Sequence, residues 1–190
     1  MAGKDESDMI LTIAEVMELI PDYAEESELK ILNLLNAVES MVRQYTNNNF
    51  QNRHIRFSAA NTGNTLHGVS HFLCIGDTVQ ISESMVNDGL YTVVDKDDES
   101  ITVMSYGLGR DTLLDVQHNL VTKVEYPQAV KQGVVNIMTW ELTGRDKVGV
   151  KSETLSRHSV TYYDQDRNNQ CNGYPVSLLG FLDLYMKARF

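Results

Sequence analysis

The chain has 190 residues and carries 16 basic against 26 acidic side chains, a formal net charge of −10. This length allows one large domain or two small ones, and the 42% of hydrophobic residues exclude a wholly disordered chain. The acidic balance argues against free wrapping around nucleic acid, because affinity for phosphates comes largely from Lys and Arg.

Two helices are predicted near the N-terminus. The first begins at the capping box Thr12-Ile-Ala-Glu15 and ends at Pro21, which cannot continue a helix. The second begins near Ser27, a suitable N-cap, and runs to about Asn47. Apolar residues recur along this second helix at helical spacing and predict one buried face. They are Leu32, Leu35, Val38, Val42 and Tyr45.

From His54 to Glu125 the pattern changes to β-branched residues that alternate with polar ones, interrupted by Gly, Asn and Asp. Several short strands at this spacing predict a small β-barrel. A turn is expected at Asn87-Asp88-Gly89, with the glycine supplying a positive φ. The strands are expected at Leu73–Ile81 (interrupted at Gly76-Asp77), Leu90–Val94, Ser100–Met104 and Asn119–Val124.

Helical spacing returns after Pro127, and Gly144 is placed to cap this third helix. Lys151–Tyr163 alternates again and predicts a strand arm, and a final helix is expected from Pro175 to Phe190. The predicted fold is α+β, a small helical bundle with a β strand arm and an inserted small β-barrel. The helical body is expected to comprise residues 1–52 and 127–190, and the barrel residues 53–126.

The final helix has apolar side chains on nearly all of its faces, and such a helix must be buried on all sides. One interpretation is burial against a partner protein. The other is that the helix folds back and completes the core between the second and third helices. The residues concerned are Leu178, Leu179, Phe181, Leu182, Leu184, Tyr185 and Phe190.

The sequence offers no pattern typical of catalysis, and we expect no enzymatic activity, cofactor or metal. His67 and His71 stand four residues apart, but Gly68 and Ser70 argue against the helix that would place them on one face. The acidic run Asp95–Glu99 lacks the spacing of a calcium loop and predicts a solvated hairpin tip. No Ser or Cys has the context of an activated nucleophile.

The sequence also bears on the compartment. No apolar run is long enough to cross a bilayer, and Met1 to Asp8 is polar and acidic, unlike a signal peptide. Cys74 and Cys171 stand far apart and predict buried or idle thiols rather than a disulfide framework. We therefore expect a protein that is made and used in a cytoplasm, or in a particle assembled there.

Three stretches together resemble the head-to-tail connector (adaptor, head-completion) proteins of long-tailed bacteriophages. They are the end of the second helix, Val38–Phe50, the arm, Lys151–Tyr163, and Tyr174-Pro175 with the apolar segment that ends Lys187-Ala-Arg-Phe190. The shortest members of that family lack the β segment. Within it, Phe72–Ile81 and Asn87–Val93 resemble a small SH3-like barrel that occurs as an insert in phage structural proteins.

The resemblance implies a structural protein of the virion, located in the phage neck. The subunits would form a homo-oligomeric ring, usually of about twelve copies. This ring docks under the portal protein, extends the DNA channel without specific DNA binding, and offers a surface to a tail-side neck or tail-completion protein. The apolar residues of the final helix, Leu178 to Phe190, are then the expected portal-docking residues.

The arm is the expected contact between neighbouring subunits in such a ring, because a protruding strand can extend a neighbour's sheet. The residues expected to make this contact are Ser152, Glu153, Arg157, Val160 and Tyr162. An ordinary internal hairpin is the alternative interpretation of the same residues. Two other functions also remain open: a tail-completion protein of the same neck, and a monomeric SH3-like peptide-binding module.

Overall fold

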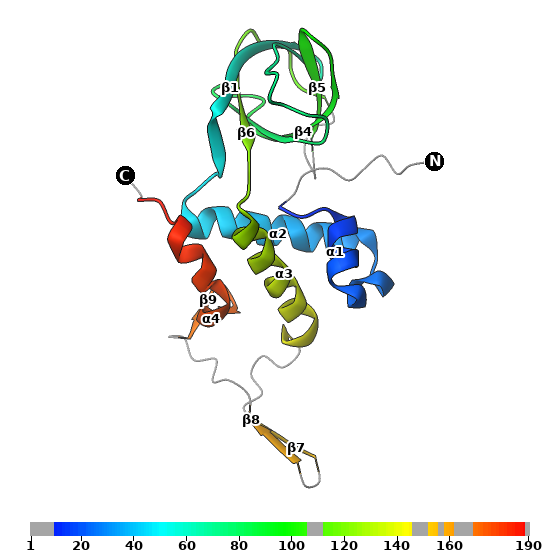
Figure 1. The fold of residues 1–190 in the computed structure, drawn as a ribbon, viewed down its shortest axis with the longest axis vertical. Helices are drawn as coiled ribbons and strands as arrows, with labels where there is room; N and C mark the ends of the chain where they lie inside the picture. Colours follow the sequence, from blue (N-terminus) through cyan, green and yellow to red (C-terminus); the bar gives the residue numbers. More distant parts are fainter. Residues whose placement is uncertain (1–9, 106–111, 146–151, 156–157, 162–168, 189–190) are drawn as a thin grey trace. The chain divides into compact units, whose positions relative to one another are not determined.

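The computed structural model describes residues 10–105, 112–145, 152–155, 158–161 and 169–188. These residues form two compact units, a barrel unit and a helical unit (Figure 1). The barrel unit comprises Asn49–Tyr126 and the described residues up to Thr12, and the helical unit comprises Ile13–Asn48 and the described residues from Pro127 onward. Residues 10–12 and 49–52, expected in the helical body, therefore belong to the barrel unit.

The helical unit is built on α2 and α3, with shorter helices around them. Pro21 ends α1 as expected and then opens a turn of 3-10 helix. The bounds are α1 (Ile13–Leu19), the 3-10 helix η1 (Pro21–Glu25), α2 (Glu28–Thr46), α3 (Gln128–Thr143), α4 (Val176–Leu179) and the 3-10 helix η3 (Gly180–Tyr185).

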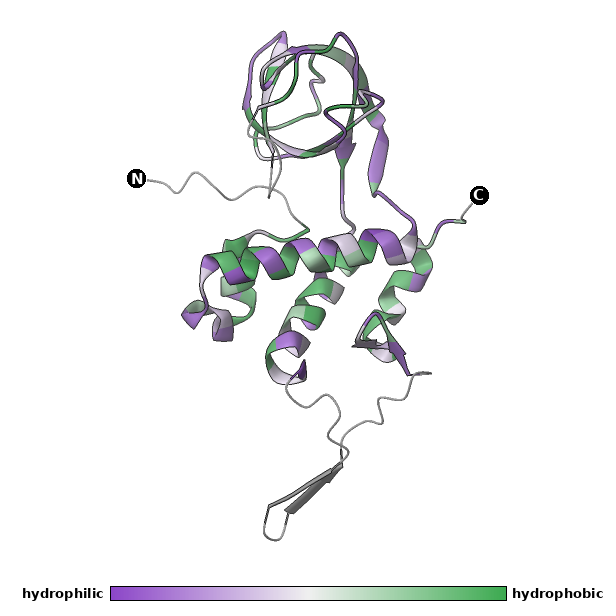
Figure 2. Cartoon of the chain, turned by 180° about the vertical axis from the view of Figure 1, so that it is seen from behind, coloured by the Kyte–Doolittle hydropathy of each residue, from purple (hydrophilic) through white to green (hydrophobic). Residues whose placement is uncertain are grey.

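The residues at the two ends of α2 explain where this helix starts and stops. The Ser27 side chain accepts a hydrogen bond from the backbone N–H of Lys30, as an N-cap does. Asn47 ends the helix in the left-handed conformation, which Asn tolerates better than most residues. Figure 2 shows hydrophobic and hydrophilic residues alternating along α2, as expected of an amphipathic helix. Its buried apolar residues are Ile31, Leu35, Val38 and Val42.

The barrel unit contains a closed barrel of antiparallel strands in the order β1-β2-β5-β4-β3-β6. Strand β6 closes it by pairing with β1 on one side and with β3 on the other, so the barrel has no free sheet edge. The bounds are β1 (Gln51–Thr62), β2 (Thr65–His67), β3 (Thr78–Ser82), β4 (Gly89–Lys96), β5 (Ser100–Ser105) and β6 (Asn119–Val124).

The antiparallel order gives the barrel two distinct ends. Gln51 pairs with Val124, so the chain enters β1 and leaves β6 at the same end. The opposite end, called the distal end below, carries the β3–β4 loop (residues 83–88) and the segment before β6 (residues 112–118). Apolar side chains from every strand fill the interior, because alternate residues of a strand point inward. They are Ala59, Leu66, Val79, Ile81, Tyr91, Val93, Ile101, Val103 and Val121.

Three buried asparagines close the distal end of the barrel. Asn119 donates hydrogen bonds to the Ala59 carbonyl (3.1 Å) and to the Asn61 side chain (3.0 Å). Asn87 donates to the side chain of Asn119 at 3.3 Å. Asn87 also donates to the carbonyl of Leu114 (2.8 Å) and accepts from its N–H (3.0 Å). The three amides thus replace the ladder bonds that a turning segment lacks.

Two expected strands differ from the observed elements. Of Leu73–Ile81, only the second part is a strand, because Gly76 has a φ of +94° and the chain turns before β3 begins at Thr78. The expected strand arm, Lys151–Tyr163, is an antiparallel hairpin of β7 (Ser152–Leu155) and β8 (His158–Thr161).

The final helix is much shorter than the expected Pro175–Phe190. A small hairpin of β9 (Gln170–Cys171) and β10 (Tyr174–Pro175) precedes α4, which continues directly into η3. The chain then becomes extended at Met186, and Phe190 lies outside the described residues.

The observed fold is therefore α+β, with helices and a small closed barrel, as the sequence predicted. Within the described ranges no helix is both long and apolar enough to cross a membrane.

Candidate interaction surfaces

The terminal segment, Tyr174–Ala188, packs on α2 and α3 of its own chain. The side chains of Leu179 and Leu182 are 0% exposed. This burial agrees with the interpretation in which the segment completes the core of its own chain. In this fold neither side chain is exposed for a contact with a partner protein.

Hydrogen bonds fix the terminal segment to the end of α2. Three consecutive residues at the end of α2 take part in them, one through its backbone carbonyl and two through their side-chain amides. The pairs are the Lys187 N–H to the Thr46 carbonyl (2.8 Å), the Asn47 amide to the Ala188 carbonyl (3.0 Å) and the Asn48 amide to the Tyr185 carbonyl (3.1 Å). The Asn run that ends α2 therefore also anchors the C-terminal part of the chain.

A close approach between α3 and η3 depends on a glycine. Gly133 is buried in the middle of α3, and a Cβ atom at this position would overlap the ring of Phe181. Glycine inside a helix costs roughly 1 kcal/mol relative to alanine. The sequence accepts that cost here because only glycine leaves room for the aromatic ring.

We expect Gly133→Ala to destabilise the helical unit by about 1–3 kcal/mol through overpacking, although alanine is the better helix former. Urea denaturation followed by the fluorescence of Trp140, the one tryptophan of the chain, measures this change. In a Phe181→Ala background the same substitution should stabilise instead. Stabilisation by Gly133→Ala in the wild-type background would show that the ring does not pack on α3.

The outer side of the terminal segment keeps part of the expected docking surface. Leu184 is 89% exposed, and Val176 and Met186 are also exposed. Leu178, Phe181 and Tyr185 are half-buried. The apolar residues of this segment are thus divided between the core and the surface.

A cluster around Arg145 brings together the end of α3, which precedes residues 146–168, and Tyr174 of β10, which follows them. The guanidinium of Arg145 lies 5.4 Å from the Trp140 ring and 5.3 Å from the Tyr174 ring, and donates two hydrogen bonds to the Glu141 carboxylate. Burial, and then the interaction with Glu141, raise the pKa of Tyr174 above its ordinary value. The cluster therefore holds the end of α3 close to Tyr174 of β10.

The β7–β8 hairpin pairs Ser152 with Thr161 and Glu153 with Val160. Neither strand pairs with a third one among the strands that the structure describes. The outer edges of a hairpin can accept a further strand, and a two-stranded hairpin by itself is only marginally stable in water. Arg157 and Tyr162, also expected at a subunit contact, lie outside the described residues.

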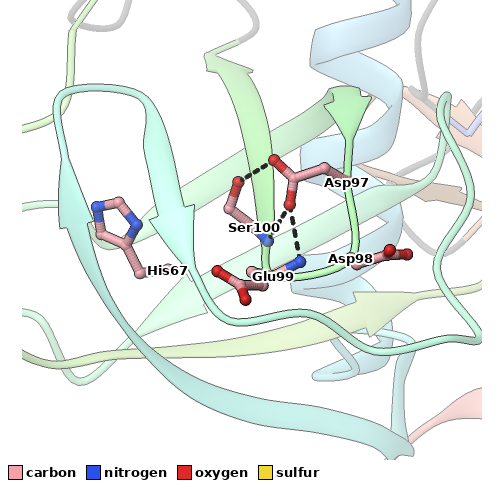
Figure 3. Close-up of a pocket in the computed structure, with 5 residues that line it drawn as sticks. All are labelled: His67, Asp97, Asp98, Glu99 and Ser100. Atoms are coloured by element: carbon pink, nitrogen blue, oxygen red, sulfur yellow. Dashed lines mark hydrogen bonds between the residues drawn. The ribbon is translucent and has the colours of Figure 1, made fainter.

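The acidic hairpin tip between β4 and β5 lines an open hollow of about 420 Å³ with His67 (Figure 3). The Asp97 carboxylate accepts from the backbone N–H of Glu99 (2.7 Å) and of Ser100 (2.6 Å), and these bonds lower the pKa of Asp97. Figure 3 shows the carboxylates of Asp97, Asp98 and Glu99 turned in different directions. In the described part of the chain, no three His, Cys, Asp or Glu side chains converge to hold a metal.

The structure brings together Ser58, His118 and Glu83, which the sequence did not connect. The Ser58 hydroxyl lies 2.9 Å from Nδ1 of His118, and Glu83 lies 3.7 Å from Nε2. Ser58 is exposed on the outside of β1, where its backbone pairs with Leu120. This grouping lacks the features of a nucleophile site, because the acid is beyond hydrogen-bond distance and the strand ladder occupies the backbone at Ser58.

Comparison with protein-family models gives no match for this chain, and no curated protein matches its sequence.

Proposed function

We propose that this chain is a head-to-tail connector subunit of a bacteriophage neck, as its resemblance to that family implies. In this proposal several copies form a ring under the portal protein, extend the DNA channel and present a surface to the tail. The net charge of −10 suits a channel through which DNA passes without being held. The barrel would be an SH3-like insert carried by each subunit.

One observation supports this proposal most strongly. The first and third stretches of the resemblance, Val38–Phe50 and Tyr174–Phe190, are far apart in sequence, yet their described residues are hydrogen-bonded in one unit through Thr46, Asn47 and Asn48. The second stretch, Lys151–Tyr163, contains the hairpin that leaves this same unit between α3 and α4. Apart from Asn49 and Phe50, the described residues of the three stretches therefore belong to the helical unit.

In the proposed ring the β7–β8 hairpin pairs with a strand or an edge of the neighbouring subunit. Ring subunits meet head to tail, so each needs two different complementary surfaces. A hairpin that is marginal by itself gains stability when its free edge is paired, which would couple its folding to assembly.

Portal docking in this proposal uses the exposed side of the terminal segment, above all Leu184, together with Leu178, Phe181 and Tyr185. A small contact of this kind binds weakly for one subunit. A closed ring presents many copies at once, and linked contacts raise the overall affinity by avidity.

Replacing Ser152–Thr161 with a Gly-Ser linker of equal length tests the proposed arm. We expect the variant to keep its melting temperature, because the hairpin pairs with no other described strand, but to lose the ring. Mass photometry of the chain, alone and mixed with the portal protein encoded by the same genome, measures the assembly. A matched control replaces Asp97–Glu99, the solvated tip of another hairpin, with Gly and Ser.

Three outcomes separate the proposed functions. A ring that forms equally well without the hairpin would assign the subunit contact to another surface. A chain that stays monomeric even with portal would contradict the connector function and favour the peptide-binding module. A ring that binds a tail tube but no portal would favour a tail-completion protein.

A further inference from the structure

The distal end of the barrel carries an exposed apolar patch. Met85 is 92% exposed, Val86 is 48% exposed and Leu114 is 46% exposed. The β3–β4 loop, which carries Met85 and Val86, meets the segment that carries Leu114, because Asn87 forms two hydrogen bonds with the backbone of Leu114. The patch lies at the end opposite to the one where the chain enters and leaves the barrel.

The loop that holds Met85 is fixed in an unfavourable conformation. Glu83 has a φ of +62° and Met85 a φ of +66°, in the left-handed region that residues with a Cβ rarely adopt. The Asp88 carboxylate accepts from both the N–H and the hydroxyl of Ser84 at 2.9 Å, and the Ser84 hydroxyl oxygen accepts from the Asn87 N–H at 2.7 Å. The Tyr91 hydroxyl donates to the Asn87 carbonyl at 2.8 Å. These bonds determine the loop and keep Met85 outward.

The choice of methionine at this position is not explained by the fold. Glycine would adopt this positive φ without strain. A methionine side chain that stays in solvent adds no hydrophobic stabilisation to the fold. A strained backbone that presents a large apolar side chain to solvent is typical of a binding site. The unbranched methionine side chain also adapts well to an apolar pocket.

Charges around the patch indicate the kind of partner. Glu83, Asp88 and Asp115 are exposed beside it. The described residues of this end, 62–65, 83–88 and 112–118, contain no Lys or Arg, and His118 is their one basic group. An acidic rim disfavours a second copy of this acidic chain and an anionic membrane surface, and favours a partner with Lys or Arg around its pocket.

We propose that the distal end of the barrel docks Met85 into an apolar pocket, rimmed by lysines, on a different protein of the same phage particle. This proposal rests on the proposed connector function, since it takes the partner from the assembled particle. The barrel then serves as a second attachment point, separate from the hairpin and from the terminal segment.

Carbodiimide cross-linking of purified particles tests the proposal, because the reagent joins carboxylates to lysine amines that are in contact. Peptide mass spectrometry should find Glu83, Asp88 or Asp115 linked to a lysine of another particle protein. Met85→Gly should reduce this link at least tenfold, while the melting temperature of the purified chain stays the same or rises. The control, Ile75→Ser, removes an exposed apolar residue outside the distal end and should leave the link intact.

Each other result overturns the proposal in a distinct way. Links only to lysines of this same chain would show contact between copies instead of a different partner. No link, with the chain present in the particle, would show that the distal end is free. Absence of the chain from purified particles would contradict the connector function itself, and the docking proposal with it.

Discussion

Leu182→Ala is expected to lower the free energy of unfolding of the helical unit by about 2–5 kcal/mol. Leu182 is fully buried where η3 packs against α2 and α3, so alanine leaves a cavity in addition to the lost apolar burial. Trp140 lies on α3 in the same unit, and its fluorescence during urea denaturation follows this unit. The substitution should shift the denaturation midpoint without changing the slope.

The matched control is Leu184→Ala, two positions further along the same 3-10 helix. Leu184 is almost fully exposed, and its substitution should change stability by no more than about 0.5 kcal/mol. If Leu182→Ala were as mild as Leu184→Ala, the terminal segment would not belong to the core. The expected assignment of Leu182 to a partner surface would then be restored.

Asn119→Ala should destabilise the barrel unit by several kcal/mol, since each buried polar group left without a partner costs about 1–3 kcal/mol. Asn119 is 0% exposed, and its amide links β1 through Ala59 and Asn61 to the β3–β4 loop through Asn87. Alanine would leave the Ala59 carbonyl and part of the Asn87 amide without these partners. The distal end should therefore open before the rest of the barrel.

Hydrogen exchange read by mass spectrometry measures this opening directly. Peptides that cover Ala59–Thr62 and residues 83–88 should exchange faster in Asn119→Ala, while peptides from α2 and α3 should not change. Gln117→Ala, an exposed neighbour on the same segment, is the control and should behave like the unchanged protein. Unchanged protection around Ala59 in Asn119→Ala would mean that the asparagine network does not hold the distal end.

Elements with local signals could be predicted from the sequence. Ser27 starts α2 through its side chain, and Asn47 ends it through a left-handed backbone conformation. Strand β6 has the bounds that the sequence predicts, Asn119–Val124. The predicted hairpin of β4 and β5 is also observed. A solvated acidic turn between two apolar strands is the sequence signal for it. Cap and turn chemistry depends on neighbouring residues and is therefore visible in one sequence.

Elements decided by distant contacts could not be predicted in the same way. The apolar run after Pro175 suggested one long helix, but packing of Phe181 on Gly133, far away in sequence, accompanies a short α4 followed by η3. Residue type does not predict that Leu179 is buried and Leu184 exposed, because both are leucines. Tertiary packing overrides local preference at such positions.

The conformation of the distal end of the barrel, a candidate site, could not be predicted from the sequence either. The sequence placed a positive φ at Gly89, whereas the structure has positive φ at Glu83 and Met85, and Gly89 begins β4. Left-handed residues are usually signalled by Gly or Asn, and here neither residue type marks the positions. A network of side chains from three separate segments fixes this loop, so the exposure of Met85 becomes visible only in the folded chain.

Cryo-electron microscopy of the neck in purified phage particles tests the connector function most directly. The connector function predicts a closed ring of this chain directly beneath the portal, with the β7–β8 hairpin of each subunit paired to its neighbour. A neck whose density contains no copy of this chain would contradict the connector function, and so would isolated copies that touch no second subunit.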